Sequence, residues 1–95
     1  MQQTVTPHPD TLKTKLNARL KRIEGQVRGL QKMIDNDTYC DDVLTQLASV
    51  QAALNGVAKQ LLSQHMHTCV KTRLEKGDDT VLDELDVTIA RLLKR

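Results

Sequence analysis

The feature that most constrains this fold is an apolar seam whose positions alternate in steps of four and three. The seam runs from Leu16 to Ile34 in steps of 4, 3, 4, 3 and 4, and it resumes from Cys40 to Cys69 in steps of 3, 4, 3, 4, 3, 4, 4 and 4. Such spacing is typical of one face of an amphipathic helix. Because the chain has no Phe, no Trp and one Tyr, it lacks the large rings that fill compact cores. We therefore predict an all-α protein packed along aliphatic seams, in part between chains.

Turn-forming residues mark the first boundaries in the chain. Residues 1–10 contain both prolines and no periodicity, which predicts a mobile N-terminal tail before a single domain of residues 11–95. The sequence DNDT at 35–38 ends the first helix, and Asp37 or Thr38 is expected to cap the next one.

One long central helix is expected over residues 38–76. No proline interrupts this stretch, and Gly56 within it costs only about 1 kcal/mol. The sequence GDD at 77–79 ends the helix, and apolar residues from Leu82 to Leu92 predict a short third helix. The predicted protomer therefore has three helices.

Length and composition indicate how the protein is stabilised and in which compartment it acts. A chain of 95 residues buries only a modest core, so a lone protomer is expected to be marginal and to associate with itself. The sequence shows no membrane-spanning apolar run and no secretory leader, which predicts a soluble, cytoplasmic protein with reduced thiols. In that compartment, Cys and His residues together indicate metal or redox chemistry more often than a disulfide.

Two cysteines and one histidine lie on the seam of the central helix. His65 and Cys69 are four residues apart on one helical face and can share a metal ion. Cys40 precedes His65 by roughly 37 Å at 1.5 Å per residue, so it cannot join them from its own chain. In an antiparallel pair of central helices, however, Cys40 of one protomer would arrive beside His65 and Cys69 of the other. The spacing therefore predicts a dimer with two shared sites.

Two thiolates and one imidazole suit Cu(I), whereas Zn(II) would need a fourth ligand. The competing interpretation is that Cys40 and Cys69 are small core residues and that His65 is a seam histidine. A catalytic Cys–His pair is disfavoured because no orienting third group accompanies it, so no enzyme is expected. His67 is assigned to the surface, and His8 in the tail is either solvated or an additional ligand.

Charge is strongly segregated, although the net charge is only +2. Residues 13–32 hold seven Lys and Arg against one Glu, whereas residues 33–58 hold four Asp and no basic residue. A basic helix face is often merely solvated, but this concentration favours salt-dependent binding to DNA phosphates. The spacing of helix-turn-helix or zinc-finger proteins is absent from the sequence. The candidate DNA contacts in this stretch are Lys15, Arg19, Arg22 and Arg28.

These motifs together resemble the copper-sensing operon repressors of the CsoR/RcnR family of bacterial metal-responsive repressors. The resemblance covers almost the whole chain from about Leu16 to Leu93. It rests on RLKRIEGQVRGLQKMI at 19–34, YCDDVLTQLASVQAAL at 39–54, HMHTC at 65–69 and LDEL at 82–85.

The resemblance implies that Cys40, His65 and Cys69 bind Cu(I) across a dimer interface. It also implies that Tyr39 and Glu84 couple this site to DNA binding, and that two antiparallel dimers form a disc-shaped tetramer. The expected protein is a repressor that binds operator DNA without metal and releases it on binding Cu(I), which derepresses copper-efflux genes. Its expected partners are operator DNA and further copies of itself, with no membrane and no small-molecule substrate.

Two alternatives and one departure from the family pattern remain. Nickel- and cobalt-responsive members carry an N-terminal histidine, a role that His8 could fill. A metal-buffering protein with an incidental basic face would bind no specific DNA. A basic residue that some members carry in the second helix falls at Gly56 here, and Lys59 is the candidate replacement.

Overall fold

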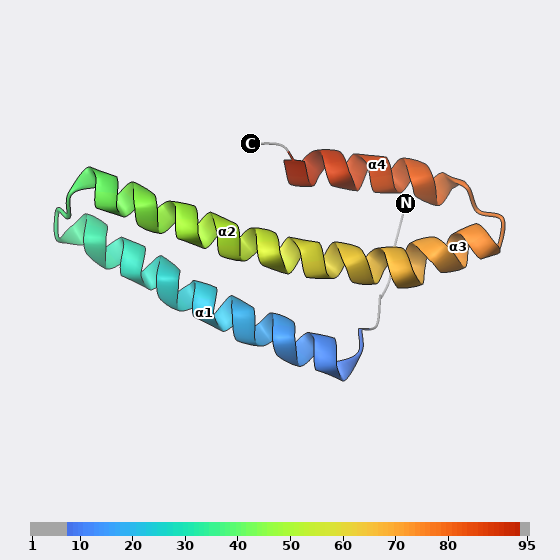
Figure 1. Cartoon of the computed structure of the whole chain (residues 1–95), viewed down its shortest axis with the longest axis horizontal. Coiled ribbons are helices and arrows are strands. Elements are labelled where there is room, and N and C mark those ends of the chain that lie inside the picture. The colour runs from blue at the N-terminus through green and yellow to red at the C-terminus, as the bar shows by residue number, and fades with distance from the viewer. Residues whose placement is uncertain (1–7, 94–95) are drawn as a thin grey trace. The chain divides into compact units, whose positions relative to one another are not determined.

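The structure, a computed structural model, describes residues 8–93 and contains no strand within that range. Its elements are α1 (Asp10–Asp35), α2 (Cys40–His65), a π-helical turn η1 (Met66–Val70), α3 (Lys71–Glu75) and α4 (Thr80–Leu93) (Figure 1). Because α2, η1 and α3 follow one another without a break, the described chain has three helical stretches. This confirms the predicted all-α protomer with a long central helix. Most of the predicted tail lies outside the described residues, and α1 begins at its last residue, Asp10.

The central helix differs in one respect from the regular α-helix that the sequence predicts. Its hydrogen bonding widens to the π-helical pattern over Met66–Val70 and returns to α-helical at Lys71. A π-turn holds more residues per turn than an α-turn, so it changes the direction of the side chains within it. The seam takes successive steps of four through Leu61, His65 and Cys69, and such steps also fit a regular α-helix, so the sequence pattern alone does not reveal the turn.

The turn after α1 is a Schellman motif. The amide of Thr38 donates to the Met33 carbonyl at 2.9 Å, and the amide of Asp37 donates to the Ile34 carbonyl at 3.2 Å. Asp37 has a φ of 55°, the left-handed conformation that this motif requires. Asp37 therefore ends α1. The sequence predicts Asp37 or Thr38 as the cap of α2, but α2 begins at Cys40, so neither residue directly precedes it. The first turn of α2 donates instead to the carbonyl of Tyr39.

The turn after α3 uses the same backbone arrangement. The amide of Asp78 donates to the Arg73 carbonyl at 2.8 Å, and Gly77 donates to the Leu74 carbonyl at 3.0 Å. Gly77 has a φ of 83°, which glycine adopts without steric cost. The chain then reverses, and α4 runs back against η1 (Figure 1). Val81, in the first turn of α4, is fully buried.

The chain forms two compact units, and the division between them falls within α2 after Val57. In the first unit, α1 lies antiparallel to the first part of α2 (Figure 1). Its buried core consists of Leu16 and Ile23 from α1 and Val50 and Val57 from α2. These residues are spaced by seven along each helix, so the core uses every second position of the predicted seam.

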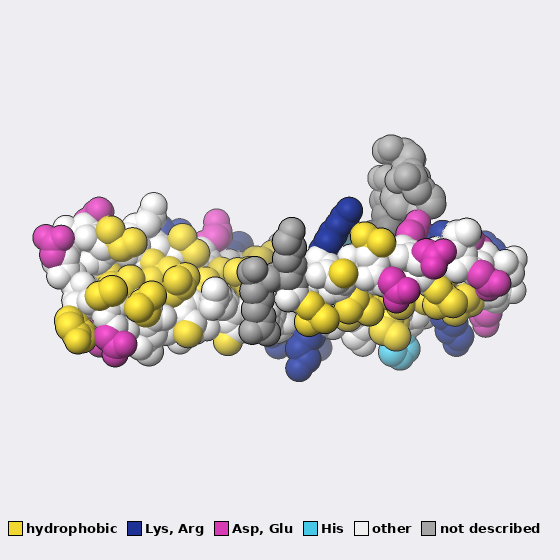
Figure 2. Space-filling model, turned by 90° about the horizontal axis from the view of Figure 1, so that it is seen from above, with side chains coloured by type: hydrophobic (Ala, Val, Ile, Leu, Met, Phe, Trp, Pro, Cys, Tyr) yellow, Lys and Arg dark blue, Asp and Glu magenta, His cyan; other side chains and the backbone are white. Residues whose placement is uncertain are grey.

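The intervening seam positions remain exposed. In the first unit their exposed fractions lie between 40% and 64%: Leu20, Val27, Ile34, Leu47 and Leu54. Figure 2 shows hydrophobic side chains at the surface, with acidic side chains around them where α1 leads into α2. An apolar surface of this kind marks a site of protein association. None of the described helices is long and apolar enough to cross a membrane.

Candidate metal centre

The three predicted metal ligands lie at the two ends of the central helix. Cys40 is the first residue of α2 and is exposed, whereas His65 is its last residue and is half-buried. Cys69 lies within η1 and is also half-buried. Among residues 8–93, no three His, Cys, Asp or Glu side chains gather into a group that could hold a metal ion. The described part of a single chain thus does not assemble the predicted donor set.

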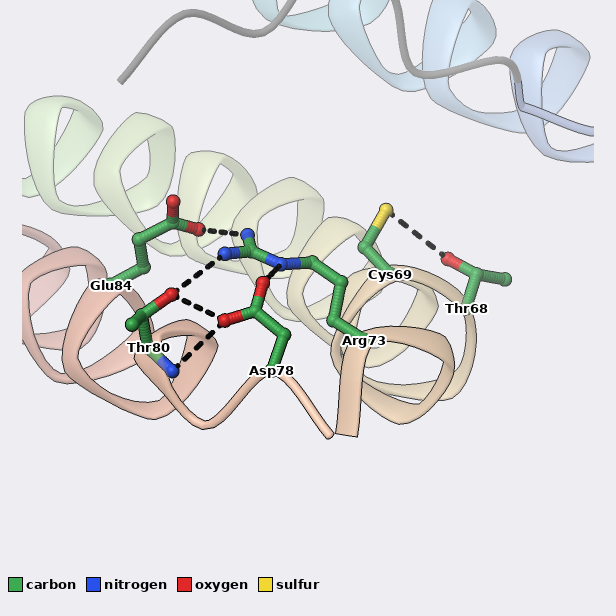
Figure 3. Close-up of polar contacts among 6 residues, drawn as sticks. All are labelled: Thr68, Cys69, Arg73, Asp78, Thr80 and Glu84. Carbon is green, nitrogen blue, oxygen red and sulfur yellow. Dashed lines mark hydrogen bonds and ion pairs between the residues drawn. The ribbon is translucent and has the colours of Figure 1, made fainter. Parts of the chain in front are cut away.

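The surroundings of Cys69 leave its sulfur weakly held. The hydroxyl of Thr68 donates to the Gln64 carbonyl at 2.7 Å and lies 3.7 Å from Sγ of Cys69 (Figure 3). A hydroxyl has a single proton, so the shorter bond to Gln64 leaves the contact with Sγ as a weak one. The thiol of Cys69 is therefore available as a ligand.

Two further histidines take different environments. His67 is exposed, as predicted, and its Nδ1 lies 2.9 Å from the Ser63 carbonyl, to which it donates. His8 is half-buried, and its Nδ1 is buried without a hydrogen-bond partner among the described residues. Buried polar atoms are normally paired, so this nitrogen is a group that a ligand could satisfy. The role of His8 as an additional ligand stays a prediction.

A polar cluster that the sequence analysis missed joins α3 to α4. Nη1 of Arg73 donates to Glu84 at 2.6 Å, and Nε donates to Asp78 at 2.8 Å (Figure 3). Nη2 of Arg73 also lies 3.3 Å from the hydroxyl of Thr80. Asp78 in turn accepts hydrogen bonds from the amide and the hydroxyl of Thr80 at the start of α4. Arg73 therefore fastens the turn and α4 to the helical stretch that follows Cys69.

The charges in this cluster stabilise one another. The hydrogen bonds to Glu84 and then to Asp78 raise the pKa of Arg73 above its usual value. Hydrogen bonds from Thr80 and then from Arg73 lower the pKa of Asp78 below 3.8, its ordinary value. Hydrogen bonding to the charged form is the cause in both cases. The Arg73 guanidinium and the Asp78 carboxylate are thus both charged at neutral pH.

The two residues that the resemblance links to coupling have contrasting environments. Tyr39 immediately precedes Cys40 and is 73% exposed. Glu84 is half-buried, and Arg73 holds its Oε2. The described residues provide no hydrogen-bond donor for its other carboxylate oxygen. Glu84 can therefore accept a further hydrogen bond without leaving Arg73.

The candidate DNA contacts are cations on α1 and α2. All are exposed: Lys15, Arg19, Arg22 and Arg28 on α1 and Lys59 on α2. In the described part of the chain, the ion pairs found involve Arg73 and none of these five residues. Cations without protein partners can bind phosphates and release the counterions around DNA.

The chain thus carries soft donors at the two ends of α2 and exposed cations on α1. A family model described as metal-sensitive transcriptional repressor matches residues 12–91 of the chain. The match extends over most of α1 and α4 and all that lies between them. The chain belongs to this family of metal-sensitive transcriptional repressors, which is the family predicted from the sequence.

Individual relatives resemble the chain closely. The copper-sensing transcriptional repressor CsoR of Bacillus subtilis is 49% identical over 77 residues, which are 79% of this chain and 76% of the relative. The crystal structure of CsoR with Cu(I) from Geobacillus thermodenitrificans has a TM-score of 0.86 and 41% identity, with 96% of both chains covered. The nickel-responsive transcriptional regulator InrS has a TM-score of 0.73 and 38% identity, with 84% of this chain and 91% of InrS covered.

Proposed function

We propose that this chain is a Cu(I)-responsive transcriptional repressor, which binds operator DNA in its metal-free form and releases it when Cu(I) binds. Release would allow expression of genes for copper efflux or handling. The observation that carries the proposal is the donor set of Cys40, His65 and Cys69 in a metal-sensitive repressor. Similarity to two copper-sensing relatives supports the choice of metal. The proposed protein is not an enzyme and acts in the cytoplasm, where thiols stay reduced.

The residues present fit Cu(I) as the cofactor. Thiolates and imidazole are soft ligands, and a set of three suits Cu(I) without a further protein ligand. The thiol of Cys40 is exposed, and that of Cys69 makes only a weak contact. The role of the bound ion is to tie together donors from two different helix ends.

The proposed site needs two chains. The exposed side chains of Leu47 and Leu54 offer a surface for antiparallel packing of two α2 helices. Such packing would place Cys40 of one protomer beside His65 and Cys69 of its partner, and the two-fold symmetry would make two equal sites. Burial of this surface would also supply stability that a single short chain lacks. We propose that two such dimers form a tetramer.

Metal binding must be transmitted to the DNA surface on α1. We assign this role to Tyr39 and Glu84. Glu84 is suited to it because Arg73 holds only one of its carboxylate oxygens, so the other can accept a hydrogen bond from the ring of His65. The cations of α1 and Lys59 would contact the DNA phosphates.

A nickel-responsive repressor is the second candidate. The observation that favours it is the buried Nδ1 of His8, which has no partner among the described residues. A fourth donor from His8 would make the site better suited to Ni(II) than three donors alone.

A DNA-binding experiment tests these candidates. In a gel-shift assay, the metal-free protein should bind specific DNA fragments from the genome of its source organism and slow their migration. Cu(I) added at one ion per protomer should release them, and Ni(II) should not. Release by Ni(II) alone would favour the nickel candidate. A protein that retains no specific fragment would be a metal buffer.

Substitution of a ligand tests the donor set. Cys69→Ala should still bind DNA, but it should lose tight Cu(I) binding and stay on DNA when Cu(I) is added. Competition with a Cu(I) chelator measures the first effect, and the gel shift measures the second. His67→Ala is the matched control, because His67 lies in the same turn outside the donor set and should behave like the parent. If the Cys69 variant is released at the same Cu(I) concentration as the parent, the assigned donor set is wrong.

A further inference from the structure

The core of the first unit brings one cation of α1 directly onto α2. Arg19 lies between the buried residues Leu16 and Ile23, and Gly56 immediately precedes the buried Val57. All three buried residues belong to the same core, so Arg19 and Gly56 flank it from opposite helices. A methyl group at Gly56 would lie 2.7 Å from Nη1 of Arg19. The guanidinium therefore rests on the surface of α2 against Gly56, which has no side chain to displace it.

This guanidinium has no protein acceptor in the described part of the chain. Neither an ion pair nor a side-chain hydrogen bond joins Arg19 to another residue between positions 8 and 93. Arg73, by contrast, uses the same chemical group to bind two carboxylates. A guanidinium carries five N–H donors in a planar fork that matches phosphate oxygens. The contact with Gly56 thus limits where the group can lie while leaving its donors unused.

We infer that Gly56 is a seat for Arg19, and that the guanidinium held there is a contact for a DNA phosphate at the junction of α1 and α2. The inference rests on the proposed function. A flexible Arg must lose rotamer freedom when it binds phosphate, and a group that already rests in place loses less. Lys15 and Arg22 are exposed one turn before and after Arg19 on α1, so the seated guanidinium lies within a row of cations. Gly56 contributes to DNA affinity although it carries no charge.

Two glycine-to-alanine substitutions test the seat in the full chain. Gly56→Ala would push the guanidinium away, whereas a methyl group at Gly29 would meet nothing within 4 Å. Both positions are helical, so both substitutions should raise the thermal midpoint by about 4 °C. Only Gly56→Ala should weaken binding of metal-free protein to operator DNA, by about tenfold and with a shallower dependence on salt. Cu(I) affinity should be unchanged in both.

A double substitution identifies the route of the effect. In an Arg19→Ala background, Gly56→Ala should cause no further loss of DNA affinity, because the group it displaces is already absent. Full additivity would overturn the inference, since the loss would then come from another effect, such as altered association of chains. Parent-like DNA binding by the Gly56→Ala protein would also overturn it, while the proposed function would stand. If the parent itself retains no specific DNA, both fall together.

Discussion

Arg73 and Arg19 carry the same guanidinium in opposite settings. Arg73 donates to Glu84 at 2.6 Å and to Asp78 at 2.8 Å, so its charge is paired with two carboxylates of the same chain. Arg19 rests on Gly56 without an acceptor among the described residues. Partly exposed ion pairs add little to stability, so the main effect of Arg73 is to fix the direction of α4. The guanidinium of Arg19 is therefore available to the proposed DNA phosphate.

The Asp78 carboxylate should make stability depend on pH. Because its pKa is lowered in the folded chain, the folded state gains stability at any pH above the ordinary value of 3.8. That contribution is lost as pH falls through the lowered pKa, where the folded carboxylate also takes up a proton. Asp78→Asn should therefore be less stable than the parent at neutral pH, and the difference should shrink in acid.

Thermal unfolding from about pH 7 down to about pH 2 measures this change. Asp79→Asn is the control, because the Asp79 side chain takes part in none of the contacts of the Arg73 cluster. A difference between the Asp78 variant and the parent that stays constant in acid would contradict the assigned cause.

At the scale of elements, the π-turn is the feature most closely tied to the site. It begins directly after His65 and contains Cys69. π-helical turns cost hydrogen-bond geometry and are frequent at functional sites. Here α4 packs against the turn, and the Arg73 cluster fastens α4 to the next helical segment. Contacts from α4 thus support the local structure around His65 and Cys69, the proposed donor pair.

The left-handed position at the end of α3 should require glycine. Gly77→Ala should lower the free energy of unfolding by about 1–2 kcal/mol, because a side chain is strained at positive φ. A methyl group there would meet nothing within 4 Å, so the cost belongs to the backbone alone. Asp37→Gly, at the equivalent position after α1 with a φ of 55°, should not lower it. Urea denaturation measures both, and equal losses would show that φ is not the cause.

At the scale of the whole molecule, the exposed half of the seam favours association. The core of the first unit takes one set of seam residues, and the other set remains at the surface. With one set buried and the other exposed, the seam can pack both within its own chain and against a second copy. The proposed metal site depends on that second copy, so assembly and metal binding should fail together.

Leu54→Lys should separate the chains and abolish tight Cu(I) binding, because a charge would be buried in the α2 interface without a partner. Analytical ultracentrifugation and chelator competition measure the two effects. Leu82→Lys is the matched control, since Leu82 is 46% exposed, as is Leu54, but lies on α4. It should leave the assembly and Cu(I) affinity unchanged. A Leu54 variant that remains dimeric and binds Cu(I) tightly would refute the antiparallel arrangement.

The sequence by itself determined the helices and their turns, and it also carries the proposed donor set. Periodicity and turn residues act over a few positions, so steps of four and three, DNDT and GDD were sufficient to place three helical stretches. The chemistry of Cys40, His65 and Cys69 is likewise a property of the residues themselves, although their assembly into one site stays a proposal.

The tertiary structure decided what the local pattern leaves open. Seam residues all look alike in the sequence, and only the packing of α1 on α2 buries Leu16 and Ile23 while leaving Leu20 and Val27 exposed. The same packing sets Arg19 on Gly56, and the reversal at Gly77 brings Glu84 to Arg73. These pairs are distant in sequence, and contact between them depends on the relative direction of two helices. That direction is settled by how whole surfaces fit together, which no short stretch of residues specifies.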